Sequence, residues 1–317
     1  MNKLAVIALG GNAISRSDQE GTIEQQEENV KETLLNIVYL IKQGYNIVIT
    51  HGNGPQVGNI IMRNDAGEQL YDITQMPLDI CVADSQGGIG YLIERVLRNL
   101  LRKENLHRDI LTLVTQVVVD KNDPAFLNPK KRIGKYYTKA EAEVLEKEKN
   151  WELRKTPKKE GMFRRVVPSP TPISIFNRET ISKIARNGTI VIAVGGGGIP
   201  VYIDDNGNLI GIEAVIDKDM ASSVLAQRIK ADELYILTDV PYIYLDFNKP
   251  TQRIVEYLDS ADANKYLKEG QFGEGSMAPK IKAAVSFVEK GGQKSIITEA
   301  TKLEDKSFGS KITLNYD

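Results

Sequence analysis

The chain has 317 residues, of which 41% are hydrophobic and 26% are charged, and its formal net charge is −1. These values are typical of a globular protein and exclude an intrinsically disordered one. A charge so close to zero also provides no global field that would attract nucleic acid or an anionic membrane.

Residue counts narrow the chemistry further. Only two histidines are present, which excludes a histidine-rich metal site. The single cysteine, Cys81, lies in the apolar stretch LDICVAD, where a buried and inert thiol is expected. No signal peptide and no membrane-spanning segment are expected, so the predicted location is the cytoplasm.

The first fifty residues predict a β-α-β unit. Leu4–Leu9 is a continuous apolar run, typical of a strand that is covered on both faces. Apolar residues then recur at helical spacing through residues 30–41, and Gly44 ends the predicted helix. Residues 46–50 form a second β-type run. Such a unit implies a parallel sheet with a right-handed crossover.

The alternation of helices and strands continues to the end of the chain. Leu78–Lys103 is predicted as a helix in two pieces, broken near Gly87 and Gly88, and residues 110–119 as one strand. Later helices are expected at Arg178–Arg186, 220–230 and 280–290, each followed by a strand, at 189–194, Glu233–Thr238 and 295–298. This pattern predicts an α/β protein, with one three-layer α/β/α domain spanning residues 1–317.

Residues 120–165 interrupt the alternation and are predicted to form an inserted subdomain. They hold 14 lysine and arginine residues against 8 acidic ones. Composition alone favours a solvated insertion whose charges face water. The alternative is a basic flap that closes over a polyphosphate.

Glycines cluster directly after three predicted strands, at Gly10-Gly11-Asn12, at Gly52-Asn53-Gly54 and at residues 195–198. Ligands of open parallel sheets bind at the carboxyl ends of the strands, where glycine leaves backbone N–H groups free to face an anion. Three such turns favour an anion cradle over three unrelated tight turns. The P-loop pattern GxxxxGK[ST] is absent, and GxGxxG fails because Gly58 comes one residue too late.

Phosphoryl transfer needs lysines that position and neutralise the transferred group. Lys218, in AVIDKDMAS, is the best candidate, and its neighbour Asp217 could orient lysines or be an outer partner of Mg²⁺. Lys280 opens a predicted helix after a glycine-rich loop, and Lys131 lies in the basic insertion. Each of these residues, taken alone, could equally be a capping or surface residue. Tyr244 is either a stacking wall for a nucleotide base or a core aromatic residue.

These residues belong to a longer, ordered set of motifs, and with it the chain resembles the carbamate kinases of the amino acid kinase superfamily nearly end to end. The motifs are ALGGNAI, THGNGPQVG, SQGGIGY, DPAF with PKKRIG, VVPSPTP, VIAVGGGGIPV, EAVIDKDMAS, ILTDV and GSMAPK. The resemblance implies an open, mainly parallel eight-stranded sheet, a protruding subdomain and a homodimer. It also implies the reaction ATP + carbamate ⇌ ADP + carbamoyl phosphate with Mg²⁺, commonly used to form ATP during arginine fermentation.

The resemblance also implies roles for individual residues. Lys131 would reach the transferred group, Lys218 and Lys280 would bind the nucleotide phosphates, and Asp217 would organise the lysines. The carbamate and the phosphoryl group would be held by Gly10, Gly11, Asn12, Gly52, Asn53 and Gly54. The nucleotide-binding set would contain Asp239 and Met277, from ILTDV and GSMAPK, beside Tyr244. No residues dedicated to metal binding are expected, so Mg²⁺ would arrive with ATP or ADP.

The hypothesis is direct in-line transfer without a covalent intermediate, because carbamate is already an anion and needs no general base. One alternative is a kinase acting on acetylglutamate or a similar acid. Many superfamily relatives carry a lysine before the first Gly-Gly pair, and this chain has Ala8 and Leu9 there, which favours the carbamate branch. A nucleotide sensor without activity is a second alternative. Nucleic-acid binding through the insertion is a third alternative, and only weak binding of this kind is expected.

Overall fold

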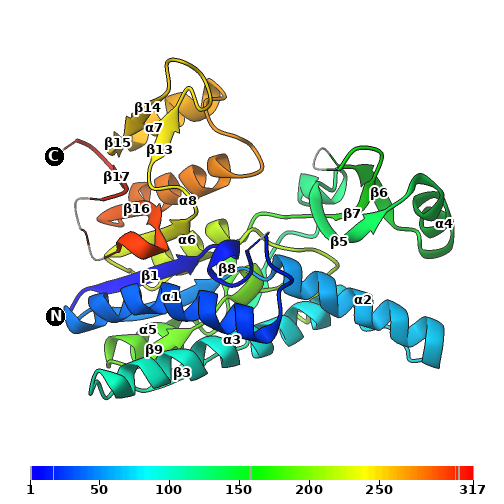
Figure 1. Ribbon diagram of the computed structural model, residues 1–317, viewed down its shortest axis with the longest axis horizontal. Helices are drawn as coiled ribbons and strands as arrows, with labels where there is room; N and C mark the ends of the chain where they lie inside the picture. The colour runs from blue at the N-terminus through cyan, green and yellow to red at the C-terminus, as the bar shows by residue number, and fades with distance from the viewer. Residues whose placement is uncertain (1, 17, 157–158, 304, 306–307, 317) are drawn as a thin grey trace.

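The computed structural model describes residues 2–16, 18–156, 159–303, 305 and 308–316 (Figure 1). Its centre is an eight-stranded sheet with the order β15-β17-β16-β12-β1-β2-β9-β3. Every neighbouring pair in this sheet is parallel except β16 and β17. The strands are β1 (Leu4–Leu9), β2 (Asn46–His51), β3 (Ile110–Thr112), β9 (Ile190–Ile192), β12 (Glu233–Thr238), β15 (Tyr257–Asp259), β16 (Lys294–Glu299) and β17 (Ser310–Thr313).

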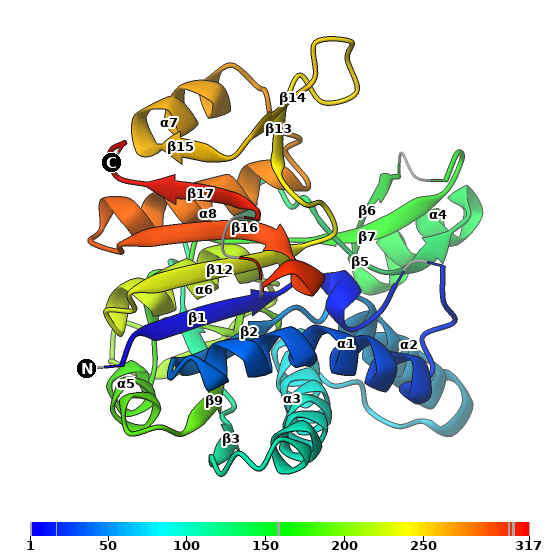
Figure 2. The same cartoon turned by 60° about the vertical axis from the view of Figure 1, so that its left-hand side comes forward.

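Helices cover both faces of the sheet and make three layers, which confirms the predicted fold class (Figure 2). One hydrophobic cluster joins the sheet to α1 (Ile23–Lys42) and α3 (Leu78–Lys103). A second cluster joins the opposite face to α5 (Arg178–Arg186), α6 (Lys218–Arg228), α7 (Ser260–Lys268) and α8 (Met277–Glu289). Strand β1 is apolar throughout because its alternate residues enter the two clusters.

The predicted break of the helix near Gly87 and Gly88 is wrong, because α3 runs unbroken from Leu78 to Lys103. A glycine inside a helix costs only about 1 kcal/mol relative to alanine. The long buried face of α3 offsets this cost. A third glycine has a packing reason, since a Cβ on Gly90 would lie 2.2 Å from Cγ2 of Thr112 on β3. Glycine therefore lets α3 approach the sheet.

The single strand predicted over residues 110–119 is also wrong. Its first part is β3, and its second part is β4 (Gln116–Val118), which belongs to a separate four-stranded sheet. Between them, Gln86 of α3 accepts a hydrogen bond from the Thr115 N–H at 2.7 Å and donates one to the Thr115 carbonyl oxygen at 3.1 Å. The Thr115 carbonyl oxygen also accepts a bond from the backbone N–H of Ile199 at 2.9 Å, so the Thr115 backbone stays satisfied where the chain changes sheets. That sheet has the order β11-β10-β4-β8, with β8 (Ser174–Ile175), β10 (Ile199–Ile203) and β11 (Leu209–Gly211).

Other predicted boundaries shift by a few residues. The helix expected at 220–230 begins at Lys218, and the helix expected at 280–290 begins at Met277. The first helix therefore begins at the candidate Lys218, and the second contains the candidate Lys280 in its first turn. The strand expected at 189–194 is shorter, because Val194 already has a left-handed backbone with φ of 55°.

A small antiparallel sheet stands apart from the main one, above α2 (Gly54–Tyr71) in Figure 1. Its order is β5-β7-β6, and its own small core contains Tyr137, Ala142 and Leu153. It consists of β5 (Lys131–Tyr137), β6 (Glu152–Lys155), β7 (Phe163–Val167) and the helix α4 (Lys139–Lys149). A two-stranded ribbon, β13 (Ile243–Leu245) and β14 (Arg253–Val255), lies near α7. None of the helices described is long and apolar enough to cross a membrane.

Candidate active site

The first two glycine turns lie side by side at the carboxyl edge of the main sheet. Strands β1 and β2 are parallel neighbours, and Leu9 pairs with His51, so Gly10 and Gly52 leave the sheet at the same level. A Cβ on Gly10 would lie 2.7 Å from the carbonyl oxygen of Leu237 on β12. Any larger residue at position 10 would therefore push the turn away from the sheet edge.

The third glycine turn, after β9, packs onto the second. Gly196 has φ of 66°, and a Cβ on it would lie 2.3 Å from Nδ2 of Asn53. Asn53 is itself buried and donates a hydrogen bond to the Ser85 hydroxyl at 2.8 Å. Close packing onto Asn53 thus explains the glycine at position 196.

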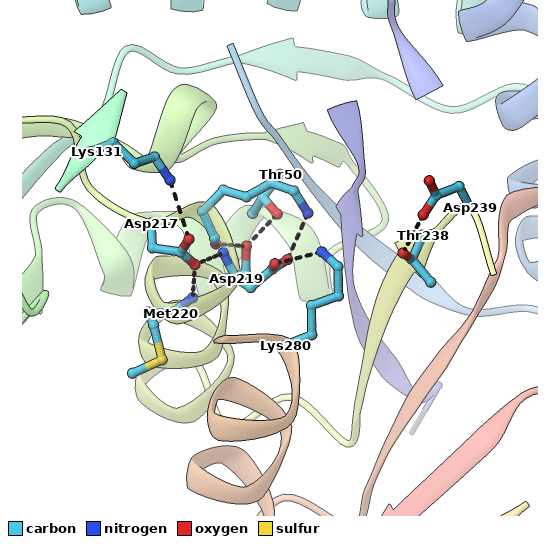
Figure 3. Close-up of polar contacts among 10 residues, drawn as sticks. Thr50, Lys131, Asp217, Asp219, Met220, Thr238, Asp239 and Lys280 are labelled. Carbon is cyan, nitrogen blue, oxygen red and sulfur yellow. Dashed lines mark hydrogen bonds and ion pairs between the residues drawn. The ribbon is translucent and has the colours of Figure 1, made fainter. Parts of the chain in front are cut away.

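A cluster of lysines and aspartates forms at the start of α6 (Figure 3). Asp217 caps this helix by accepting hydrogen bonds from the backbone N–H groups of Asp219, at 3.0 Å, and Met220, at 3.3 Å. Its other carboxylate oxygen lies 3.4 Å from Nζ of Lys131 on β5. The cap therefore holds the start of the helix and also faces the small sheet.

Asp219 joins the other two predicted lysines. Its carboxylate lies 2.6 Å from Nζ of Lys218 and 2.8 Å from Nζ of Lys280, the latter on α8. The structure thus brings together three lysines from different parts of the sequence, and Asp219 contacts two of them where Asp217 contacts one. Asp219 was not among the candidate residues, although the Asp-Lys-Asp triplet could have indicated it.

Because the cluster is buried, the charges of its lysines and of Asp219 affect one another's pKa values strongly. Asp219 is only 3% exposed, and burial alone would raise the pKa of its carboxyl group. The ammonium groups of Lys218 and Lys280 outweigh that effect and hold its pKa well below the usual range. Burial also lowers the pKa of Lys218, and the charge of Asp219 opposes that change. The carboxylate therefore helps to keep the Lys218 amine charged.

Two buried hydroxyl groups tie this cluster to the second glycine turn. Ser222 donates a hydrogen bond to the carbonyl oxygen of Lys218 at 2.6 Å, and its oxygen lies 2.6 Å from the hydroxyl of Thr50 on β2. Because the Ser222 hydrogen is already used, Thr50 is the donor between these two. Thr50 comes two residues before Gly52, so these bonds fix the position of the Lys218 backbone relative to the second glycine turn.

His51, next to Thr50, is buried and has its pKa lowered to about 4, because burial disfavours the charged ring. Its Nδ1 lies 2.9 Å from the carbonyl oxygen of Gly52. At neutral pH the ring is therefore uncharged, with Nδ1 as the donor to this oxygen. His51 therefore holds the turn at Gly52 and is a poor candidate for a base.

Three cavities meet at Lys280, which lines all of them. The first, of about 540 Å³, is lined by Gly10, Gly11, Asn12 and Asp239 among others. The second, of about 250 Å³, is lined by Gly52, Asn53, Gly54, Asp217, Asp219 and the three lysines. The third, of about 300 Å³, is lined by Asp239, Tyr244, Phe247, Phe272 and Met277. The two glycine sets therefore face different cavities, one on each side of Lys280.

The third cavity is an apolar slot. The rings of Tyr244 and Phe247 lie 5.9 Å apart between centroids, and Met277 adds a flexible apolar wall. Asp239 lines the boundary with the first cavity and accepts a hydrogen bond from Asn12 at 3.2 Å. Phe247 and Phe272 were missed, because a single aromatic residue in a loop shows no periodic pattern.

The next question is which protein side chains could bind a metal ion at this site. Within the described part of the chain, no group of three or more His, Cys, Asp or Glu residues is arranged to hold a metal ion. Asp217 and Asp219 both face ammonium groups. A metal at this site would need most of its ligands from a bound substrate.

Comparison with known proteins gives consistent results. The model of the Amino acid kinase family matches residues 3–299. The carbamate kinase of Pyrococcus horikoshii is 45% identical over 317 residues, covering 99% of this chain and 100% of the relative. That of Thermococcus kodakarensis is 47% identical and covers 93% of both chains. The solved structure of the carbamate kinase from Giardia lamblia bound to AMP-PNP has a TM-score of 0.91 and 38% identity, covering 98% of each chain.

Proposed function

Because the chain belongs to the amino acid kinase family, and within it to the carbamate kinases, we propose that its lysine cluster transfers a phosphoryl group between ATP and carbamate. The observation that carries this proposal is the convergence of Lys131, Lys218 and Lys280 on two aspartates beside a glycine turn. Phosphoryl transfer requires positive charge that is fixed before the reaction, and this cluster supplies it.

The three cavities suggest how the substrates are arranged. The nucleotide base would occupy the slot at Tyr244 and Met277, with Asp239 at its edge. The phosphate chain would then pass Lys280, which borders all three cavities. The carbamate and the transferred group would lie in the second cavity, against the turn that begins at Gly52. The first turn, at Gly10, would face the phosphate chain from the other side.

The chemistry would be direct in-line transfer. Both reactants are anions, so the main barrier is repulsion between them, and ammonium groups and backbone N–H groups lower it. Lys218 would neutralise charge on the transferred group, and Lys131 would approach from the small sheet. Carbamate needs no base, which agrees with a neutral, buried His51 beside the site.

Mg²⁺ would accompany the nucleotide, held by its phosphate oxygens, and would neutralise charge on them when bound. The inserted segment, residues 120–165, would act as a subdomain that carries Lys131 to the transferred group. A homodimer, a cytoplasmic location and ATP formation during arginine breakdown complete the proposal. Carbamate kinases from Pyrococcus and Thermococcus support the reaction by their sequence similarity, and the AMP-PNP complex of the Giardia enzyme supports the nucleotide.

The experiment is a coupled assay of ATP formation from ADP and carbamoyl phosphate, beside a panel with acetylglutamate and other acyl phosphates. We expect turnover with carbamoyl phosphate, and a loss on the order of 10²–10³ in Lys218→Ala. Lys230→Ala, on an exposed lysine just after α6, is a control that should keep full activity. Preference for another acyl phosphate, or near-normal turnover in Lys218→Ala, would contradict the proposal.

A further inference from the structure

A fourth cavity, of about 430 Å³, lies outside the site described above. It is formed where β5 and β7 of the small sheet face the first half of α2, the region below the small sheet in Figure 1. Gly54 and Arg132 line both this cavity and the second cavity of the active site. The residues that matter here are Gly54, Asn59, Arg132, Lys135, Tyr136 and Arg164.

Three cations line this cavity, and no acidic side chain among the described residues does. Arg132, Lys135 and Arg164 form no ion pair with any residue that the structure describes. Several other basic residues of the small sheet and its helix are paired, for example Lys149 with Asp65 at 3.1 Å. The cavity thus gathers positive charge that no ion pair neutralises, although Lys135 feels the more distant carboxylate of Glu141.

Arg164 shows this most clearly. Its guanidinium donates a hydrogen bond to the Gly134 carbonyl oxygen at 2.9 Å and lies 5.3 Å from the centre of the Tyr136 ring. Its Nε is buried and has no hydrogen-bond partner among the described residues. A buried N–H without a partner is costly, so a small shift of this side chain toward an acceptor in the cavity would be favourable. Burial lowers the pKa of Arg164, and the charge of Arg132 lowers it further.

Two more features of the cavity favour an anion. Helix α2 begins at Gly54, so the backbone N–H of Gly54 and the positive end of the helix dipole lie at the wall of the cavity. The side-chain amide of Asn59 is a further possible donor one turn along the helix. The volume suits a small molecule rather than a polymer.

We propose that this cavity is a second anion site, which takes a small phosphate-bearing dianion. Three unpaired cations match a dianion better than a singly charged carboxylate. Since the cavity shares Gly54 and Arg132 with the active site, the anion is carbamoyl phosphate held before it moves to the lysine cluster. This identity, unlike the binding of phosphate, depends on the proposed function. A charged entrance of this kind raises the local concentration of substrate and its rate of association.

Inorganic phosphate is the probe, with binding measured by calorimetry in Lys218→Ala, where the catalytic cavity is impaired. We expect this variant to retain a phosphate site. Adding Lys135→Gln or Arg164→Gln should weaken that site about tenfold, the effect of one charge-assisted hydrogen bond. Lys139→Gln is the matched control, since Lys139 lies on α4 in the same subdomain but outside the cavity. A lack of binding in Lys218→Ala, or binding unaffected by Lys135→Gln and Arg164→Gln, would overturn the proposal.

Kinetics then identify the anion. Lys135 is exposed and does not line the catalytic cavity. Lys135→Gln should therefore raise the KM for carbamoyl phosphate several-fold, reduce its dependence on salt, and leave kcat and the KM for ADP unchanged. An unchanged KM together with weakened phosphate binding would overturn carbamoyl phosphate as the occupant while supporting the anion site. An inactive wild-type enzyme that binds phosphate here would contradict the proposed function and still support the site.

Discussion

Replacing Asp219 with asparagine removes one negative charge from the centre of the lysine cluster and changes the shape of the side chain very little. In the folded protein, this carboxylate accepts a bond of 2.6 Å from Lys218 and one of 2.8 Å from Lys280. After the substitution, the two ammonium groups would face each other with no anion between them. Each lost charge-assisted bond is worth about 1.5–3 kcal/mol.

The effect on activity follows from the pKa of Lys218. Burial already lowers this pKa, and Asp219 is the strongest influence that raises it. In Asp219→Asn the pKa of Lys218 falls further, so more of the amine is neutral at a given pH. Because a neutral amine cannot neutralise the transferred phosphoryl group, we expect kcat to fall on the order of 10²–10³ near neutral pH. Acidification should restore part of it, since the amine is protonated again below its lowered pKa.

The assay is ATP formation from ADP and carbamoyl phosphate, with kcat and kcat/KM measured between about pH 6 and 9. Asp217→Asn is the matched control. Asparagine is also a good helix cap, so this variant keeps the start of α6. It removes the longer, half-exposed contact with Lys131 and the smaller of the two aspartate charges that raise the pKa of Lys218. It should lose less activity than Asp219→Asn. A pH profile of Asp219→Asn identical to that of the wild type, with turnover reduced less than about threefold, would refute the reasoning.

Four further outcomes are expected. Lys131→Ala should lower kcat by about 10² and leave the KM for ADP unchanged, because this lysine lies at the second cavity and not at the base slot. Tyr244→Ala should raise the KM for ADP about three- to tenfold with little change in kcat, a pattern that a purely structural tyrosine would not produce. Thr50→Val should lower the free energy of unfolding by about 1 kcal/mol and also lower kcat, and Thr50→Ser should restore both. The free energy of unfolding, measured with denaturant, should fall by about 1.4 kcal/mol per pH unit as the pH is lowered from 6.5 to about 4. The cause is His51, which binds a proton in the unfolded chain below pH 6.5 but not in the folded protein. Stability from this source is complete above pH 6.5, and His51→Gln should remove the slope where the exposed His107→Gln does not.

The sequence was most informative where the signal is local. The apolar run Leu4–Leu9 is a strand with the predicted bounds, since a strand covered on both faces is apolar along its length. The run Glu233–Thr238 also has the predicted bounds, with four hydrophobic residues between its polar ends. The prediction over residues 110–119 was wrong because a β-branched run looks the same whether it pairs in one sheet or in two. Between β3 and β4, the backbone of Thr115 donates one hydrogen bond to the Gln86 side chain and accepts another from it, and Gln86 lies almost thirty residues away in the sequence.

In the candidate site, too, residue type was predictable from the sequence and contacts between distant residues were not. Residue types and motifs selected the lysines, the glycine turns and Asp217 as candidates, because phosphoryl transfer needs cations and backbone N–H groups at strand ends. Their roles stay predictions until the variants are measured. Asp219 escaped selection because its importance depends on Lys280, sixty-one residues later, reaching the same carboxylate.

From the sequence alone came the layered α/β class, the likeness to carbamate kinases and the chemistry available to the site, because these depend on periodicity and on residue type. Only the tertiary structure decided which aspartate joins the lysines, that Lys280 borders three cavities, and that Arg132, Lys135 and Arg164 surround a fourth. The physical reason is that charge interactions depend on separation in space and on burial. Both are set by how α2, α6, α8 and the small sheet pack, and no local stretch of sequence contains that information.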